Sequence, residues 1–130
     1  MKKILLIALF PILSFAQNSY LCVPTSSTGF KFDSNTKKWN STFLSNDLKQ
    51  ILIKTDSGWQ WRDFGRNWGL KCDLKFEDDG LIICPVFYGE VKFNKKTLRY
   101  IQTYTAGYVE GIDNNKPDTP GMTIGTCSPL

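Results

Sequence analysis

Four cysteines that follow an N-terminal leader restrict the fold more than any other feature of this sequence. Lys2 and Lys3 are basic, residues 4–13 are apolar and Ala16 ends a small-residue site, which is the pattern of a cleaved signal peptide. We expect a helix within 4–15 and cleavage after Ala16, which leaves 114 of the 130 residues. The mature chain would be periplasmic or secreted, where disulfides form and persist.

The leader is too short to anchor the protein. Its apolar run of ten residues falls below the about 20 needed to cross a bilayer, and no second such run follows. We therefore predict no transmembrane segment after cleavage. Lipid attachment at Cys22 is the alternative, but Tyr20 and Leu21 lack the small side chains that such a site requires.

Four cysteines can pair in three ways. We favour Cys72–Cys84, which flanks a turn at Glu77–Gly80, together with Cys22–Cys127, which joins the two ends of the mature chain. A zinc site is disfavoured because the chain has no histidine and no Cys-x-x-Cys spacing. We predict no metal and no cofactor.

The stretch between the turn signals at 58 and 80 indicates β-structure. Residues 70–77 alternate apolar and charged side chains, which is the pattern of a half-buried strand, and residues 59–62 alternate in the same way. Asp79-Gly80 is a hairpin signal because glycine adopts the positive φ of a type I′ turn. Residues 81–84 form an apolar run that is typical of a central strand.

The rest of the chain predicts further strands separated by turns. We expect strands at 20–23, 30–32, 37–43, 91–93, 98–104, 105–111 and 122–127, with polar loops at 24–29 and 112–120. Residues 49–54 are assigned as a strand, and a helix capped by 45–47 is the alternative. The fold class is therefore all-β: a single domain over 17–130, a small antiparallel meander of about eight to ten short strands, in a barrel or a sandwich.

Two segments repeat one hairpin pattern. Residues 30–39 and 91–100 both run from an aromatic strand through Asp or Asn and Thr to a basic residue and an aromatic. With the Tyr20-x-Cys22 start, Thr28-Gly29-Phe30 and the Gly125-x-Cys127 ending, these hairpins resemble a loose group of uncharacterised small exported proteins of Gram-negative bacteria and their prophages. The resemblance implies no activity and no site residues.

Charge and composition argue against several function classes. Removing Lys2 and Lys3 leaves 14 of the 16 basic side chains against 12 acidic ones, a net charge of about +2 that does not indicate a nucleic-acid partner. Hydrolysis is poorly supported because the chain lacks histidine and its cysteines are expected to be oxidised. The acidic turns 77–79 and 113–118 could hold calcium, but a solvated turn is favoured for both.

Three tryptophans between 59 and 68 give the best functional lead. Trp59 and Trp61 are expected in the core, since a small β-domain needs large apolar side chains. Trp68 lies in a predicted loop over 62–69 with Arg62 and Arg66, and tryptophan and arginine are the usual hot spots of interfaces. The favoured hypothesis is a non-catalytic binding or inhibitor module that contacts an envelope or host protein. The alternative is an envelope protein that binds or cleaves glycans through the Trp59–Trp68 cluster.

Overall fold

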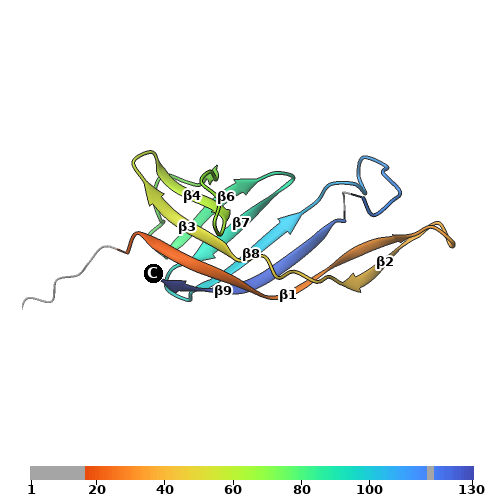
Figure 1. Ribbon diagram of the computed structural model, residues 1–130, viewed down its shortest axis with the longest axis horizontal. Coiled ribbons are helices and arrows are strands. Elements are labelled where there is room, and N and C mark those ends of the chain that lie inside the picture. Colours follow the sequence, from red (N-terminus) through yellow and green to blue (C-terminus); the bar gives the residue numbers. More distant parts are fainter. Residues whose placement is uncertain (1–16, 117–118) are drawn as a thin grey trace, which may run out of the picture.

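A single antiparallel sheet makes up the protein, and it curls until its two edges nearly meet (Figure 1). The computed structural model describes residues 17–116 and 119–130. The predicted leader, with its helix and its cleavage after Ala16, lies outside these residues. The strands are β1 (Ser19–Asp33), β2 (Lys38–Phe43), β3 (Gln50–Thr55), β4 (Gly58–Asp63), β5 (Leu70–Lys71), β6 (Leu81–Val86), β7 (Gly89–Asn94), β8 (Arg99–Tyr104) and β9 (Gly121–Pro129).

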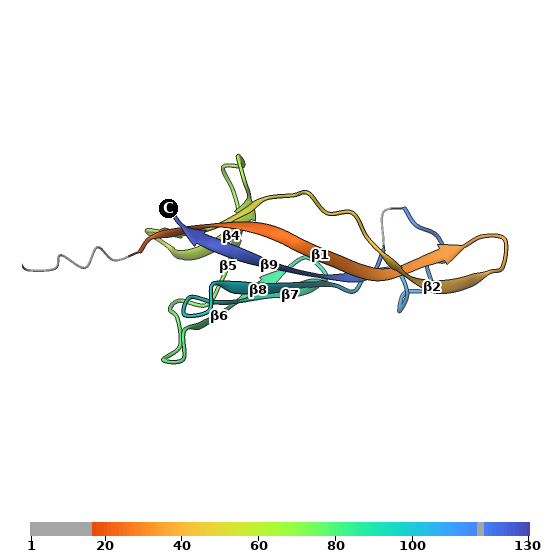
Figure 2. The same ribbon diagram turned by 90° about the horizontal axis from the view of Figure 1, so that it is seen from below.

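The strand order is β5-β4-β3-β1-β9-β8-β7-β6, with β2 paired to β1 beside this path. No residue of the described ranges is helical, so the all-β prediction is confirmed. The strand assigned to 49–54 is also confirmed, as β3. The structure also decides between the two predicted architectures in favour of a nearly closed barrel. The hairpin of β1 and β2 extends beyond the barrel at one end (Figure 2).

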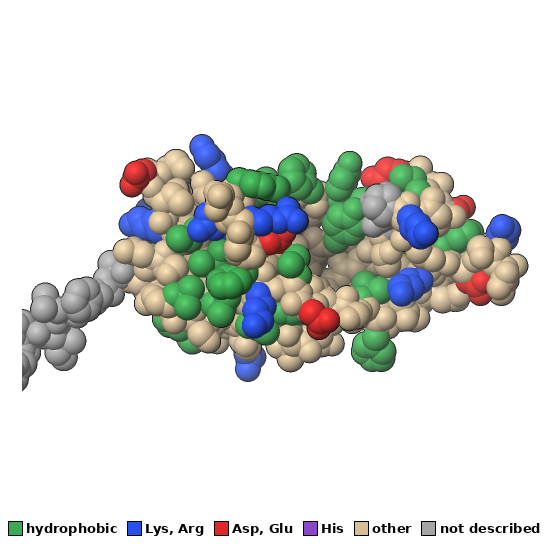
Figure 3. All heavy atoms as spheres, viewed as in Figure 1, with side chains coloured by type: hydrophobic (Ala, Val, Ile, Leu, Met, Phe, Trp, Pro, Cys, Tyr) green, Lys and Arg blue, Asp and Glu red, His purple; other side chains and the backbone are tan. Residues whose placement is uncertain are grey.

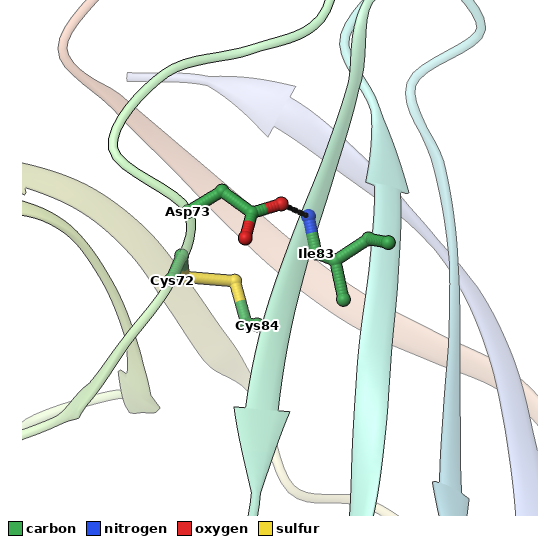
Figure 4. Close-up of a disulfide and its surroundings, with 4 residues drawn as sticks. All are labelled: Cys72, Asp73, Ile83 and Cys84. Atoms are coloured by element: carbon green, nitrogen blue, oxygen red, sulfur yellow. Dashed lines mark hydrogen bonds between the residues drawn. A yellow bond between two sulfur atoms is a disulfide. The ribbon is translucent and has the colours of Figure 1, made fainter.

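The two edges of the sheet meet at a junction that we call the seam, made by Cys72, Asp73, Ile83 and Cys84. The Cys72–Cys84 disulfide links the chain after β5 to β6. Beside it, the Asp73 amide donates to the Ile83 carbonyl at 2.9 Å. The Ile83 amide donates in turn to Asp73 Oδ2 at 3.0 Å (Figure 4). The second predicted bridge, Cys22–Cys127, is also formed and joins paired positions of β1 and β9.

The barrel interior is filled mainly by aromatic and branched side chains. The buried cluster consists of Tyr20, Cys22, Leu52, Trp59, Trp61, Ile82, Cys84, Val91, Phe93, Tyr100 and Cys127. Phe76 packs against this cluster from the segment after β5, with its ring centroid 5.0 Å from that of Trp59. Burial of these rings is the main source of stability in so small a domain.

Three predicted segments were wrong in detail. The strand expected at 70–77 ends at Lys71. Asp73 ends it, because this residue hydrogen-bonds to Ile83 through its side chain as well as its backbone. The chain then bends and leaves Leu74 84% exposed. The loop expected at 24–29 is part of β1, which pairs with β9 as far as Gly29 and accommodates Pro24 at a bulge.

The strand expected at 105–111 is a series of turns instead. Gly107 and Gly111 both have positive φ, and the Gly107 amide donates to Glu110 Oε2 at 2.7 Å. The Ile112 amide donates back to the Gly107 carbonyl at 2.9 Å. These local bonds use backbone groups that a strand would have offered to a neighbouring strand.

The two repeated hairpins form by the same local chemistry. Asp33 Oδ1 accepts the amides of Asn35 and Thr36, and Asn94 Oδ1 accepts those of Lys96 and Thr97. These backbone hydrogen bonds hold the pKa of Asp33 below its usual value. Each turn also contains one non-glycine residue with positive φ, near 55°, immediately before the returning strand: Lys37 in the first and Leu98 in the second.

We expect removal of the Cys72–Cys84 bridge, through a Cys72→Ala/Cys84→Ala variant, to lower the free energy of unfolding by about 3 kcal/mol. If the seam depends on the bridge, hydrogen exchange at the Ile83 amide should accelerate more than at amides of the β1–β9 pair. Urea titration and amide exchange measure the two effects. A uniform acceleration across the sheet would mean that the bridge acts only on the unfolded chain.

Candidate functional site

A cavity of about 200 Å³ lies where the barrel stays open past the seam, and we call it the seam pocket. Its walls come from the ends of β3, β4, β6 and β8 and from the loop between β4 and β5. The lining residues are Gln50, Trp61, Arg62, Asp63, Arg66, Trp68, Gly69, Leu70, Val86, Phe87 and Gln102. The mouths of barrels are common ligand sites, because a rigid sheet there ends in loops that can vary.

The loop over residues 64–69, which we call the mouth loop, is fixed in place by its own contacts. The Phe64 amide donates to the Lys49 carbonyl at 2.9 Å, and the Arg66 amide donates to the Asp63 carbonyl at 3.1 Å. At Gly69 the loop lies so close to β4 that an added Cβ would be 2.7 Å from the Trp61 carbonyl oxygen. Only glycine permits this approach, and it brings Trp68 to the rim of the seam pocket.

Trp68 is exposed, and its ring contacts the side chain of Arg66. Its side chain is 56% exposed, and the Arg66 guanidinium carbon lies 5.6 Å from its ring centroid, which is cation–π geometry. Arg66 is held in turn by Asp63, with Nε 3.1 Å from Oδ2. An ion pair this exposed contributes little stability, but it restricts the Arg66 rotamer and therefore the Trp68 ring.

The structure brings together all three predicted site residues, Trp68, Arg62 and Arg66, at one pocket. The other two tryptophans of the cluster are in the core, as expected: Trp59 is 6% exposed and Trp61 is 3% exposed. Trp61 nevertheless lines the inner wall of the seam pocket, so it has a core face and a pocket face. Its ring packs on that of Tyr100 at 5.3 Å between centroids.

One rim residue was missed by the sequence reasoning. Phe87, in the tight turn between β6 and β7, lines the seam pocket and is 66% exposed. The Phe87-Tyr88-Gly89 sequence signals two aromatics at a bend, and Tyr88 has a positive φ of 55°. No local pattern, however, shows that this turn faces the mouth loop from across the barrel opening. Exposed aromatics therefore lie on both lips of the pocket.

Two residues that line the pocket each carry a side-chain donor without a hydrogen-bond partner among the described residues: Trp61 Nε1 and Arg62 Nε. Both atoms are covered from solvent. Arg62 also forms no ion pair with any described carboxylate, whereas Arg66 pairs with Asp63. An unsatisfied buried donor costs roughly 1–3 kcal/mol, so both donors would gain from an added acceptor.

A second hollow, of about 430 Å³, lies where the β1–β2 hairpin leaves the barrel. Its lining is largely apolar and includes Phe30, Tyr108 and Met122. The face in Figure 3 is hollowed between the barrel and this hairpin, and hydrophobic and basic side chains lie next to one another on the barrel part. The seam pocket differs from this hollow in its charged lining residues, Arg62, Asp63 and Arg66, and in the unpaired donors of Trp61 and Arg62.

The acidic turns act as structural turns. Asp79 Oδ1 accepts the Leu81 amide at 2.9 Å, and Asp113 Oδ1 accepts the Trp39 indole N–H at 3.0 Å. Asp118 lies outside the described residues. Within 17–116 and 119–130, no three His, Cys, Asp or Glu side chains gather as metal ligands would. The same ranges contain no helix long and apolar enough to cross a membrane.

Comparison with models of protein families, with curated proteins and with solved structures found no match to this chain.

The two pocket tryptophans should respond differently to truncation. We expect Trp61→Ala to lower the free energy of unfolding by about 3–5 kcal/mol, because it leaves a cavity in the core. Trp68→Ala should lower it by less than about 1 kcal/mol, because the ring is largely in solvent. Urea titration of both variants measures the difference. Unfolding of the Trp68→Ala variant would place the mouth loop in the core.

Burial raises the pKa of Tyr100, the ring behind Trp61, to about 12. The unfolded chain then releases this phenolic proton at lower pH than the folded chain. Tyr100 therefore lowers the free energy of unfolding as pH rises from about 10 toward 12. Ultraviolet titration should show a late ionisation step that Tyr100→Phe removes. Retention of that step in the variant would assign it to another tyrosine.

Proposed function

We propose that this protein is an exported, non-catalytic binding module of the bacterial periplasm or envelope, which contacts another protein through the mouth of the seam pocket. The observation that carries the proposal is Trp68: a large ring, 56% exposed, held by a stacked Arg66 at the rim of a cavity. Exposed aromatic rings that gather at one pocket, here Trp68 and Phe87, are typical of interaction sites. Tryptophan and arginine anchors that are fixed before binding are typical of interface hot spots.

The two disulfides support the cellular location. Cys22–Cys127 and Cys72–Cys84 are both formed, which fits an oxidising compartment outside the cytoplasm. The leader-like sequence of residues 1–16 agrees with the same route. Periplasm or secretion is therefore part of the proposal.

The glycan alternative is less well supported. A row of exposed tryptophans would favour sugar binding, but Trp59 and Trp61 are buried, which leaves Trp68 as the exposed ring of this cluster. Glycoside hydrolysis by two carboxylates needs a pair of acids at the cleaved bond. The lining of the seam pocket contributes one acid, Asp63, and it is already paired with Arg66.

The test compares partner capture by three forms of the mature protein. Cross-linking pull-down from envelope extract should recover a protein with the native form and lose it with Trp68→Ala. An anchor of this kind contributes at least 2 kcal/mol, so affinity should fall by roughly thirtyfold. Leu74→Ala is the matched control, because Leu74 is an exposed apolar side chain outside the seam pocket. Equal capture by Trp68→Ala and Leu74→Ala would overturn the proposal.

A further inference from the structure

We infer that the free edge of β2 pairs with a second copy of this chain, antiparallel and about a two-fold axis at Ser41. β2 pairs with β1 along one side, and no described strand pairs with its other side (Figure 1). The two ends of the main strand order, β5 and β6, are by contrast joined at the seam. No residue of β2 lines the seam pocket, so the inference does not depend on the proposed function.

The direction of the backbone groups shows what this edge offers. The Phe32 amide donates to Asn115 Oδ1 and the Phe32 carbonyl accepts from Asn115 Nδ2, both at 2.8 Å, so these groups of Phe32 point away from β2. Trp39 lies opposite Phe32, and its own amide and carbonyl therefore point away from β1. Ser41 and Phe43 follow at intervals of two residues and point the same way.

This edge is open to another strand. Among residues 17–116 and 119–130, the outward backbone groups of Trp39 and Ser41 have no hydrogen-bond partner, and the Phe43 carbonyl accepts the Thr42 hydroxyl at 3.2 Å. β2 contains no proline, and its pairing with β1 has no bulge. Prolines, bulges and charges are the usual devices that keep an edge from adding a strand. The one charge of β2, on Lys38, stands at the end of the strand.

β2 complements itself in one register. If Ser41 lies opposite Ser41 of the second copy, Trp39 lies opposite the second copy's Phe43, and Phe43 lies opposite the second copy's Trp39. Every residue with outward backbone groups then faces another such residue. In an antiparallel ladder these three pairs exchange six hydrogen bonds.

The same register brings an exposed ring to a ring that is already fixed. Phe43 is 84% exposed. The Trp39 ring lies 5.6 Å from that of Phe32 and 5.7 Å from that of Tyr108, between centroids. Trp39 Nε1 also donates to Asp113 Oδ1 at 3.0 Å. Trp39 and Phe43 lie on one face of the sheet, and aromatic pairs directly across two strands stabilise antiparallel pairing. The two-fold axis forms this pair twice.

Charge favours a second copy in this orientation. Residues 39–43 carry no charge, and antiparallel pairing places the two Lys38 side chains at opposite ends of the joint ladder. A parallel, in-register arrangement would bring the two lysines together, which is destabilising. A strand of another protein would need the same uncharged centre and an aromatic side chain at the position that meets Trp39. β2 supplies both features itself.

Charged substitutions at Ser41 test the axis, because this residue faces its own copy. Sedimentation velocity should show a monomer–dimer equilibrium of the mature protein between roughly 1 µM and 1 mM, the range expected for a small interface. Ser41 is exposed, so Ser41→Lys and Ser41→Glu should both fold. Each variant alone should dimerise at least about tenfold more weakly, because like charges meet at the axis. An equimolar mixture of the two variants should restore the dimer.

Asn40→Glu is the matched control for the register. Asn40 is also exposed and is the neighbour of Ser41, but it faces the second copy's Thr42, so this variant should dimerise almost as the native protein does. Loss of the dimer with Asn40→Glu, together with native dimerisation of Ser41→Glu, would overturn the axis at Ser41. If the charged Ser41 variants do not fold, Phe43→Ser removes an exposed ring and should still weaken dimerisation by several-fold.

Amide hydrogen exchange distinguishes pairing of edges from packing of faces. Raising the protein concentration should slow exchange at the amides of Trp39, Ser41 and Phe43. It should leave the amides of Asn40 and Thr42 unchanged, because they already bond to β1. A dimer without this alternation would overturn the edge pairing. A protein that stays monomeric at roughly 1 mM would exclude the second copy as the occupant and leave this edge to an extended segment of another protein.

Discussion

A sheet that curls into a barrel must satisfy the backbone groups along its two edges, or it remains open to water and to other strands. Here the edges are joined by very little strand structure, since β5 has only two residues. The Cys72–Cys84 disulfide and the two hydrogen bonds between Asp73 and Ile83 replace a longer ladder. On the other side, the Cys72 amide donates to the Trp59 carbonyl at 2.9 Å, so the same short segment bonds to both β4 and β6.

The packing of the core depends on this junction. Phe76 follows the seam along the chain and lies within 5.0–6.4 Å of the rings of Trp59, Phe93 and Tyr20. Those three residues come from three different strands. The seam fixes the start of the segment that carries Phe76 into this cluster, and the Glu77 amide, which donates to the Leu81 carbonyl at 2.8 Å, fixes its end. Covalent closure therefore fixes a hydrophobic contact that the short β5 could not hold by itself.

The short β5 also produces the candidate site. Because β5 begins only at Leu70, the end of β4 and the end of β6 lack a strand between them, and the seam pocket occupies that gap. The mouth loop and the β6–β7 turn form the two sides of its rim. The site is thus built on residues whose backbones are held by the barrel, which is the arrangement that keeps a binding geometry precise.

Many features of the fold and of the candidate site could be predicted from local sequence. The features that could not be predicted depend on contacts between distant parts of the sheet. The disulfide pairing followed from the turn at 77–80 and from the two chain ends, and the placement of Trp68 in a loop followed from the glycines around it. The length of β5 did not follow, because Asp73 ends the strand only by bonding to Ile83. Phe87 was missed for the same reason, since its position opposite Trp68 is set by how the barrel closes.

The repeated hairpin shows most clearly which features local sequence determines and which features tertiary contacts determine. Both copies make the same Asx turn, yet Val91 and Phe93 in the second are fully buried, while their counterparts in the first are half exposed (Phe30) and only partly buried (Phe32). The second hairpin, β7–β8, lies between β6 and β9, so its inner face meets the core. The first extends past the barrel, and Asn115 bonds both backbone groups of Phe32 at 2.8 Å where β9 no longer reaches. A polar loop side chain thus takes over the edge pairing that a strand provides for the other copy. Local chemistry therefore specifies the turn, and the neighbours that the chain supplies decide whether the aromatics become core or surface.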